Sequence, residues 1–318
     1  MYQQKANQPV FLYPGQGELQ VGFGQDIYEQ SQAAKDVFDL DTELRDLCFH
    51  GPQERLNNPY YNQAANFLAW IAISAALKEA NILPQALAGQ SLGEYAALSY
   101  AGAFEATDAI PMLKQRARIM TELIPSNSGM SAVLGLDTKT LEQHCVDASK
   151  PQEPCTVGTY STPDRNVITG SDLAVERCAE LCRSSGARTM PVKVSRAFHS
   201  PLAQQAEEEF AKVLEGFTIN KPSLPIYYNR DGSTDCDDIG VMLAEQLVRP
   251  VQLVKIINHM LGDGLNHFVK IGPGGFFGDA VRTIARDQGL NVDLYQIESF
   301  DDIQKLSAKL KETEDSHV

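Results

Sequence analysis

A short apolar stretch that leads into a Gly-x-Ser-x-Gly pattern constrains the fold of this chain more than any other feature. Residues 86–95 read Ala-Leu-Ala-Gly-Gln-Ser-Leu-Gly-Glu-Tyr, which predicts a strand followed at once by a helix. Gly89 and Gly93 permit the sharp turn, and the turn places Ser91 at a helix N-terminus with backbone N–H groups beside its hydroxyl. The pattern predicts a nucleophile elbow; the alternative is a glycine-rich turn in which Ser91 only caps the helix.

Length and composition are those of an ordinary globular protein. The 318 residues can bury a large core and are enough for two domains, or for one large domain with an insertion. No apolar run reaches the roughly 18 residues of a membrane span, and residues 1–6 lack the charged-then-apolar order of a signal peptide. We therefore expect a cytoplasmic protein without a membrane partner.

The net charge limits the classes of partner that the protein can bind, and the cysteine spacing bears on whether it binds a metal. The formal net charge of −14 argues against nucleic acid as the main partner, because nucleic-acid binding needs a basic surface. The six cysteines are scattered without Cys-x-x-Cys spacing, which favours free thiols. Cys178 and Cys182 are four residues apart on an expected helix, but no histidine or aspartate array completes a ligand set there. We predict that they pack in the protein and that there is no metal site.

The elements around the elbow follow the order of an α/β protein. The expected elements are a strand at 10–13 with a Pro-Gly-Gln-Gly turn, a helix over 60–80, the elbow, and helices over 92–101 and 107–123. Thr107 is the expected cap of the last helix. This order predicts a sheet with helices on both faces.

The pattern changes near residue 127, after a turn of small residues. The expected elements are a strand at 130–136, a helix over 139–148, strands at 155–160 and 166–169, a helix over 172–184 and a strand at 188–194. That β-α-β-β-α-β order is typical of a ferredoxin-like subdomain, here inserted into the larger domain.

The chain then returns to the larger domain. The expected elements are a helix over 202–214, a strand at 226–229, helices over 239–247 and 250–261, and a strand at 267–271 that ends in a glycine-rich loop. We therefore predict a large α/β domain over 1–126 and 201–305, a ferredoxin-like subdomain over 127–200, and a polar C-terminal tail over 306–318, of which residues 311–318 are polar enough to fray.

A serine nucleophile needs a base, and the chain has six histidines. Only His199 lies in a loop directly after an expected strand, in the sequence Ala-Phe-His-Ser-Pro. Composition does not select a catalytic histidine, because a single histidine often has a structural role.

Seven short motifs, collinear from about residue 9 to 300, carry a resemblance to a known family. They are Tyr13-Pro14-Gly15-Gln16-Gly17, Asn62-Gln63, Gly89-Gln90-Ser91-Leu92-Gly93-Glu94, Gln115-Arg116-Ala117-Arg118, Ala197-Phe198-His199-Ser200, Pro250-Val251-Gln252 and Ile271-Gly272-Pro273-Gly274. In order and spacing they resemble the malonyl-CoA:acyl carrier protein transacylase family and the acyltransferases of polyketide synthases. The resemblance implies an α/β-hydrolase-like large domain with a parallel sheet and an inserted ferredoxin-like subdomain.

The resemblance also implies roles for the residues at the elbow. Ser91 looks like the nucleophile and His199 like the general base of a Ser-His dyad. The imidazole would be oriented by a backbone carbonyl near Gln252, the residue named for this role, rather than by an aspartate. The backbone N–H groups of Gln16 and Leu92 would form the oxyanion hole.

A second set of residues is implied to recognise the acyl group. Arg116 matches the family arginine that pairs with the free carboxylate of malonate, a task suited to its planar guanidinium. Phe198 resembles the malonyl-selecting form of its motif, and its bulk would exclude an α-methyl branch. Gln63 and Gln90 look like pocket residues, although Gln90 stands where the family usually has a histidine.

These expectations combine into a ping-pong acyl transfer. Malonyl-CoA would acylate Ser91, and the phosphopantetheine thiol of an acyl carrier protein would then take the malonyl group. We expect these two substrates, no bound cofactor, and a monomer. Because carrier proteins are acidic, we predict a basic docking rim of Lys193, Arg196 and Arg249.

Two other functions remain open at this level. The first is a hydrolase on the same scaffold that removes stalled acyl groups from carrier proteins, against which Arg116 argues. The second is a non-catalytic docking member of the family, against which the retention of Ser91, His199, Gln16 and Arg116 argues.

Overall fold

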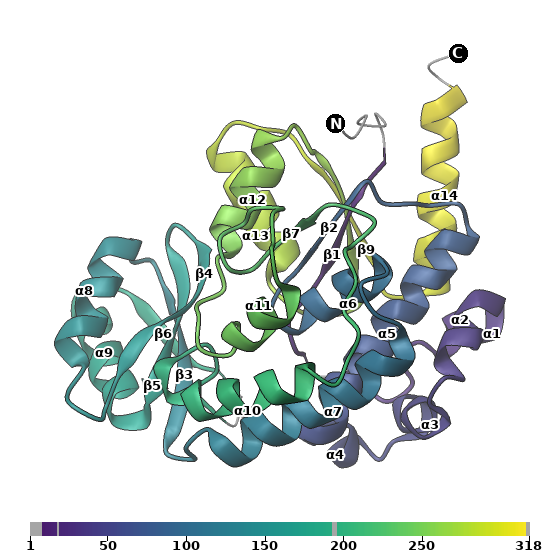
Figure 1. Ribbon diagram of the computed structural model, residues 1–318. Helices are drawn as coiled ribbons and strands as arrows, with labels where there is room; N and C mark the ends of the chain where they lie inside the picture. Colours follow the sequence, from purple (N-terminus) through teal and green to yellow (C-terminus); the bar gives the residue numbers. More distant parts are fainter. Residues whose placement is uncertain (1–7, 18, 193–195, 316–318) are drawn as a thin grey trace.

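Two β-sheets organise the chain, one in each half of the molecule (Figure 1). The computed structural model describes residues 8–17, 19–192 and 196–315. One sheet has five parallel strands and the other has four antiparallel strands. The expected α/β class, with a parallel sheet and a smaller second sheet, is therefore confirmed.

The large sheet has the strand order β7-β2-β1-β8-β9. Its strands are β1 (Val10–Tyr13), β2 (Ala86–Gly89), β7 (Ile226–Tyr227), β8 (His267–Ile271) and β9 (Asp293–Ile297). Strands β1 and β2 are buried throughout and pair in parallel, with Tyr13 opposite Gly89. Because parallel strands end at the same edge, the turn after β1 lies beside the elbow after β2.

Helices cover both faces of the large sheet. Alternate side chains of β1 point to opposite faces, so Phe11 and Tyr13 join one apolar core while Val10 and Leu12 join another. The first core includes residues of α5 (Pro59–Glu79), α6 (Leu92–Tyr100), α7 (Ala106–Leu123), α10 (Gln204–Leu214) and α11 (Ile239–Glu245). The second core includes residues of α12 (Leu253–Gly262) and α13 (Phe277–Asp287).

The smaller sheet has the strand order β4-β5-β3-β6 and packs against two helices. Its elements are β3 (Ser128–Leu134), α8 (Thr138–Ala148), β4 (Cys155–Thr162), β5 (Arg165–Ser171), α9 (Asp172–Ser184) and β6 (Arg188–Pro191). The expected β-α-β-β-α-β order is confirmed. The predicted end of the last strand falls on residues 193–194, outside the described residues.

Four N-terminal helices were not predicted from the sequence. They are α1 (Gln25–Gln30), α2 (Gln32–Phe38), α3 (Thr42–His50) and α4 (Gln53–Leu56). Each is short, so its apolar periodicity is weak. The cap expected at Thr107 is also wrong: α7 begins at Ala106, and its N-cap residue is Glu105, whose side chain makes no capping hydrogen bond.

The C-terminal end is more ordered than expected. Helix α14 (Phe300–Asp315) follows β9 and crosses the boundary predicted between residues 305 and 306. Ile303 and Leu306 are buried in the first core, which anchors the start of the helix, so the predicted start of the polar tail at residue 306 falls inside a packed helix. Fraying over 311–318 stays a prediction. In the described part of the chain, no helix combines the length and apolar character that a membrane crossing requires.

The packing of α14 predicts a stability loss for Leu306→Ala. Leu306 is only 3% exposed, so removing its side chain leaves a cavity and should lower the free energy of unfolding by about 2–5 kcal/mol. Urea denaturation measures the change, and Gln304→Ala on the exposed face of the same helix is the control. Equal midpoints for the two variants would contradict the packing.

Candidate active site

The elbow between β2 and α6 depends on close contact between main-chain segments. Ser91 has φ 52° and ψ −108°, a conformation that L-residues seldom adopt. A Cβ atom at Gly89 would lie 2.1 Å from the carbonyl carbon of Gly93, and one at Gly93 would lie 2.3 Å from the carbonyl oxygen of Tyr13. Both positions therefore require glycine. The Ser91 side chain makes no capping bond to α6, so the plain N-cap alternative is wrong.

Ser91 and His199 form a hydrogen-bonded pair although 108 residues separate them. The Oγ of Ser91 lies 2.8 Å from Nε2 of His199, and Nδ1 of His199 lies 2.8 Å from the main-chain oxygen of Gln246. A carbonyl oxygen can only accept, so Nδ1 carries the proton and Nε2 presents its lone pair to the serine hydroxyl. This is the tautomer that a general base needs.

The environment of His199 keeps the imidazole neutral. Burial, as the main cause, lowers its pKa to about 4, and the positive charge of Arg116 acts in the same direction. The hydrogen bond to the Gln246 carbonyl opposes the shift. At neutral pH the ring is therefore ready to accept the Ser91 proton.

The predicted orienting residue, Gln252, is wrong, and Gln246 takes its place. Gln252 is the N-cap of α12, where its carbonyl oxygen accepts a hydrogen bond from the N–H of Ile256. Gln246 is the C-cap of α11, where the helix leaves its last carbonyl groups without intrahelical donors. The end of a helix thus offers His199 an acceptor that the start of the next helix does not.

The predicted oxyanion hole lies where two turns meet. The N–H of Gln90 donates to the carbonyl of Tyr13 over 2.9 Å, which holds the turn after β1 against the elbow. The main-chain N–H groups of Gln16 and Leu92 donate to no acceptor among the described residues, and Leu92 is the first residue of α6. That arrangement agrees with the predicted role of the two N–H groups, which stays a prediction.

Arg116 is a buried cation that contacts neutral groups. Its side chain is 1% exposed on α7, and it donates to Gln63 Oε1 over 2.8 Å and to Gln246 Oε1 over 3.1 Å. The guanidinium lies 5.2 Å from the centroid of the Tyr95 ring, and its Nε has no partner. Within the described chain no carboxylate forms an ion pair with it. A buried cation without a counter-ion is costly, so this group is suited to bind an anion.

The remaining predicted pocket residues, Gln63, Phe198 and Gln90, lie next to Arg116, His199 and Ser91. Gln63 joins the two parts of the site, because its Nε2 lies 3.4 Å from Gln16 Oε1 while its Oε1 binds Arg116. Phe198 is half-buried and directly precedes His199, and Gln90 is half-buried beside Gly15. Their roles in substrate selection stay predictions.

Three residues with structural roles in the site were missed. Glu94, Asn229 and Gln246 are buried, and Asn229 and Gln246 both donate hydrogen bonds to the Glu94 carboxylate. The Asn229 Oδ1 also accepts the N–H of Ser91 over 2.7 Å. Glu94 could have been identified, because it lies in the elbow motif. Asn229 and Gln246 lie far from the elbow in sequence, and no local pattern marks them.

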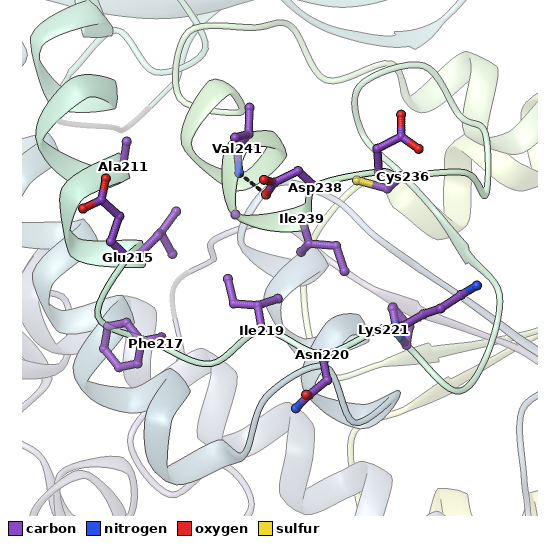
Figure 2. Close-up of a pocket in the computed structure, with 14 residues that line it drawn as sticks. Ala211, Glu215, Phe217, Ile219, Asn220, Lys221, Cys236, Asp238, Ile239 and Val241 are labelled. Atoms are coloured by element: carbon purple, nitrogen blue, oxygen red, sulfur yellow. Dashed lines mark hydrogen bonds between the residues drawn. The ribbon is translucent and has the colours of Figure 1, made fainter.

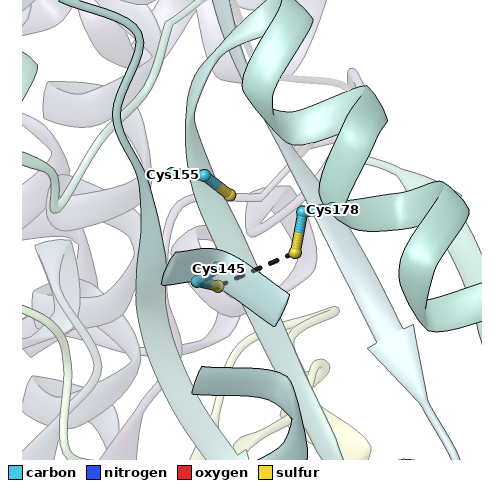
Figure 3. Close-up of side chains that lie close together, drawn as sticks. All are labelled: Cys145, Cys155 and Cys178. Carbon is cyan, nitrogen blue, oxygen red and sulfur yellow. Dashed lines mark hydrogen bonds between the residues drawn. The ribbon is translucent and has the colours of Figure 1, made fainter. Parts of the chain in front are cut away.

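Three cysteines meet in the core of the smaller sheet, a proximity that their sequence spacing hides (Figure 3). The sulfur atoms of Cys145, Cys155 and Cys178 lie within 4.8 Å of one another, and apolar side chains surround them. The neighbouring Cys155 thiol and burial raise the pKa of Cys145, and protonated thiols pack as small apolar groups. The spacing suits a soft metal ion geometrically, and the expectation of no metal stays a prediction.

A cavity of about 840 Å³ lies away from Ser91 (Figure 2). It is bounded by the end of α10, the segment 217–222 and the start of α11, and Ile219 and Ile239 point toward one another across it. None of the predicted site residues lines it, and no histidine is present to serve as a base. The candidate active site is therefore the one around Ser91.

The reactivity of Ser91 should follow the protonation of His199. Because only the neutral imidazole accepts the serine proton, the rate of modification by a neutral sulfonyl fluoride should hold down to about pH 5 and halve near pH 4. Intact mass spectrometry measures the rate, and Ser91→Ala controls for other sites. A midpoint near the ordinary histidine value of 6.5 would contradict the burial argument.

Comparisons with known proteins agree with this site. The acyl transferase domain family matches residues 10–292. The chain is 36% identical to the malonyl CoA-acyl carrier protein transacylase of Bacillus subtilis, over 87% of this chain and 90% of that protein. It is 33% identical to the Escherichia coli K12 protein of the same name, over 83% of this chain and 89% of that protein.

Solved structures show the same fold. The malonyl CoA-acyl carrier protein transacylase of Clostridium perfringens has a TM-score of 0.91 at 30% identity, covering 96% of this chain and 98% of that chain. A malonyl-transacylase solved in complex with a type II PKS acyl-carrier protein has a TM-score of 0.89 at 26% identity, covering 95% and 100%. This chain therefore belongs to the acyl transferase domain family, among the malonyl CoA-acyl carrier protein transacylases.

Proposed function

We propose that this protein transfers a malonyl group from malonyl-CoA to the phosphopantetheine thiol of an acyl carrier protein, through a malonyl ester of Ser91. The observation that carries the proposal is the state of Arg116. Because the hydrogen-bond acceptors around this buried guanidinium are neutral, its charge remains available to bind the carboxylate of a substrate. An enzyme for neutral acyl chains would gain nothing from that cation. The relatives and solved neighbours named as malonyl transacylases support the same substrate.

The dyad accounts for the first half-reaction. Ser91 Oγ attacks the thioester carbonyl and gives its proton to His199 Nε2, and the N–H groups of Gln16 and Leu92 stabilise the oxyanion. When the intermediate collapses, the carbon–sulfur bond breaks and the proton on His199 passes to the departing sulfur. The products are coenzyme A and the malonyl ester of Ser91.

The second half-reaction reverses these steps with a different thiol. The phosphopantetheine thiol gives its proton to His199 and attacks the ester, and the Ser91 oxygen leaves and takes the proton back. No redox change occurs, and the residues need no cofactor for either half. Because the contacts of Ser91, His199 and Arg116 all come from one chain, we propose that the enzyme works as a monomer.

Brief exposure to malonyl-CoA should add one malonyl group to the protein, as measured by intact mass. The adduct should be absent in Ser91→Ala, which lacks the nucleophile, and holo acyl carrier protein should remove it while the carrier gains the same mass. Loss of the adduct to free malonate at the same rate with and without carrier would indicate a hydrolase instead.

The variant Arg116→Gln tests, in the same assay, whether Arg116 selects acyl groups that carry a free carboxylate. Because the buried cation is lost, kcat/KM for malonyl-CoA should fall about 10²–10³-fold. Acylation by acetyl-CoA, which has no free carboxylate, should not fall. Equal losses for both thioesters would contradict the role of Arg116.

The docking rim is only partly described. Lys193 lies outside the described residues, Arg196 donates to the carbonyl of Thr121 over 3.1 Å, and exposed Arg249 pairs with Glu245. We propose that these cations, near the dyad in sequence or structure, steer an acidic carrier protein.

Changing all three cations to glutamate should raise KM for the carrier by about tenfold, because reversed charges repel the acidic partner. The KM for malonyl-CoA should change less. The control reverses three exposed cations elsewhere and so makes the same change in net charge: Lys212, Lys221 and Arg286. Equal carrier KM values for the two triple variants would rule out this rim.

A further inference from the structure

Glu94 is a buried carboxylate to which the dyad mechanism gives no role. Its exposed fraction is 0%, and its two oxygens accept three N–H donors. Oε1 accepts the main-chain N–H of Asn229 over 2.7 Å and the Asn229 side chain over 2.8 Å, while Oε2 accepts Nε2 of Gln246. Burial is the main cause that raises its pKa to about 7, against these hydrogen bonds and the charge of Arg116.

The side-chain amide of Gln246 lies between Glu94 and Arg116 and has one orientation that satisfies its neighbours. Its Nε2 donates to Glu94 and also to the main-chain oxygen of Ser91, over 3.2 Å. Its Oε1 accepts from Arg116 over 3.1 Å. With the amide reversed, an NH₂ group would face the guanidinium, and an oxygen would face two acceptors.

The amide also keeps Glu94 and Arg116 apart. The charge of Arg116 acts to lower the pKa of Glu94, but the carboxylate forms no hydrogen bond or ion pair with the guanidinium in the described structure. A direct carboxylate–guanidinium pair would be bidentate and would compete with an incoming carboxylate. The Gln246 amide therefore places the Glu94 charge near Arg116 without a direct pair, so that the guanidinium remains available to the carboxylate of a substrate.

We propose that Glu94 is a positioning residue for substrate specificity: it locks the Gln246 amide with its oxygen toward Arg116, which orients the guanidinium for the acyl carboxylate. The inference rests on the proposed function, because it assumes a malonyl substrate. The main-chain carbonyl of Gln246 holds His199 separately, so this role concerns the choice of acyl group and not the base.

The test is Glu94→Gln, assayed at about pH 8 for acylation by malonyl-CoA and by acetyl-CoA. The new amide keeps an oxygen for Asn229 and turns an NH₂ group to Gln246, which must then reverse and present its own NH₂ to Arg116. We expect kcat/KM for malonyl-CoA to fall about 10- to 100-fold. For acetyl-CoA we expect a change of less than about threefold, because the Ser91–His199 hydrogen bond and the contact of His199 with the main-chain oxygen of Gln246 do not involve the Gln246 amide.

Glu245→Gln is the matched control. It makes the same chemical change at the residue before Gln246, where Glu245 forms a surface ion pair with Arg249. Its ratio of malonyl to acetyl acylation should equal that of the unchanged protein. Gln246→Met is the second test variant, because it removes the amide but keeps the main-chain carbonyl that binds His199, and it should also lower the ratio.

The outcomes separate this inference from the proposed function. A lowered ratio in Glu94→Gln, or in Gln246→Met if the first variant does not fold, supports the positioning role. An unchanged ratio, or equal losses for both thioesters in folded variants, overturns it. If the unchanged protein forms no malonyl adduct, the proposed function fails whatever the variants do.

Discussion

Close main-chain packing at the elbow is the constraint on which the rest of the site depends. Without side chains at Gly89 and Gly93, strand β2 can turn directly into α6 against the carbonyl of Tyr13. That contact leaves Ser91 in a strained conformation with its hydroxyl bonded to His199 rather than to the helix, and it brings the turn after β1 beside it. A single added methyl group at either glycine would separate the nucleophile from the N–H groups proposed to stabilise its oxyanion.

Two ionisable side chains of this site, His199 and Arg116, make their hydrogen bonds within the protein to neutral groups. His199 is held by a carbonyl, and Arg116 by two amide oxygens, so no carboxylate touches either group in the described structure. Burial therefore keeps the imidazole neutral without opposition from a carboxylate, and the guanidinium has no carboxylate partner. Both states suit the proposed transfer, in which His199 accepts a serine proton and Arg116 binds a carboxylate.

Prediction from sequence succeeded where the signal was local. The elbow could be predicted because its glycines and serine are neighbours in the chain. Strand β1 and helix α5 could be predicted because their apolar residues are continuous or periodic. Prediction failed for Gln252, because a carbonyl's availability depends on where helices end and not on residue type. The short N-terminal helices, and the helix α14 that crosses residue 306, were missed for a related reason: their few apolar residues can be recognised as core residues only from the packing they make.

The sequence alone predicted the α/β class and the inserted smaller sheet, and its family motifs named Ser91, His199 and Arg116 as candidate site residues. It could do so because strand and helix periodicities, glycine-dependent turns and the quoted motifs are properties of short segments. Only the tertiary structure decided that Gln246 orients His199, that Asn229 and Glu94 hold the elbow, and that Arg116 contacts only neutral acceptors. Those contacts join residues up to 138 positions apart, and hydrogen-bond partners at such separations are set by packing.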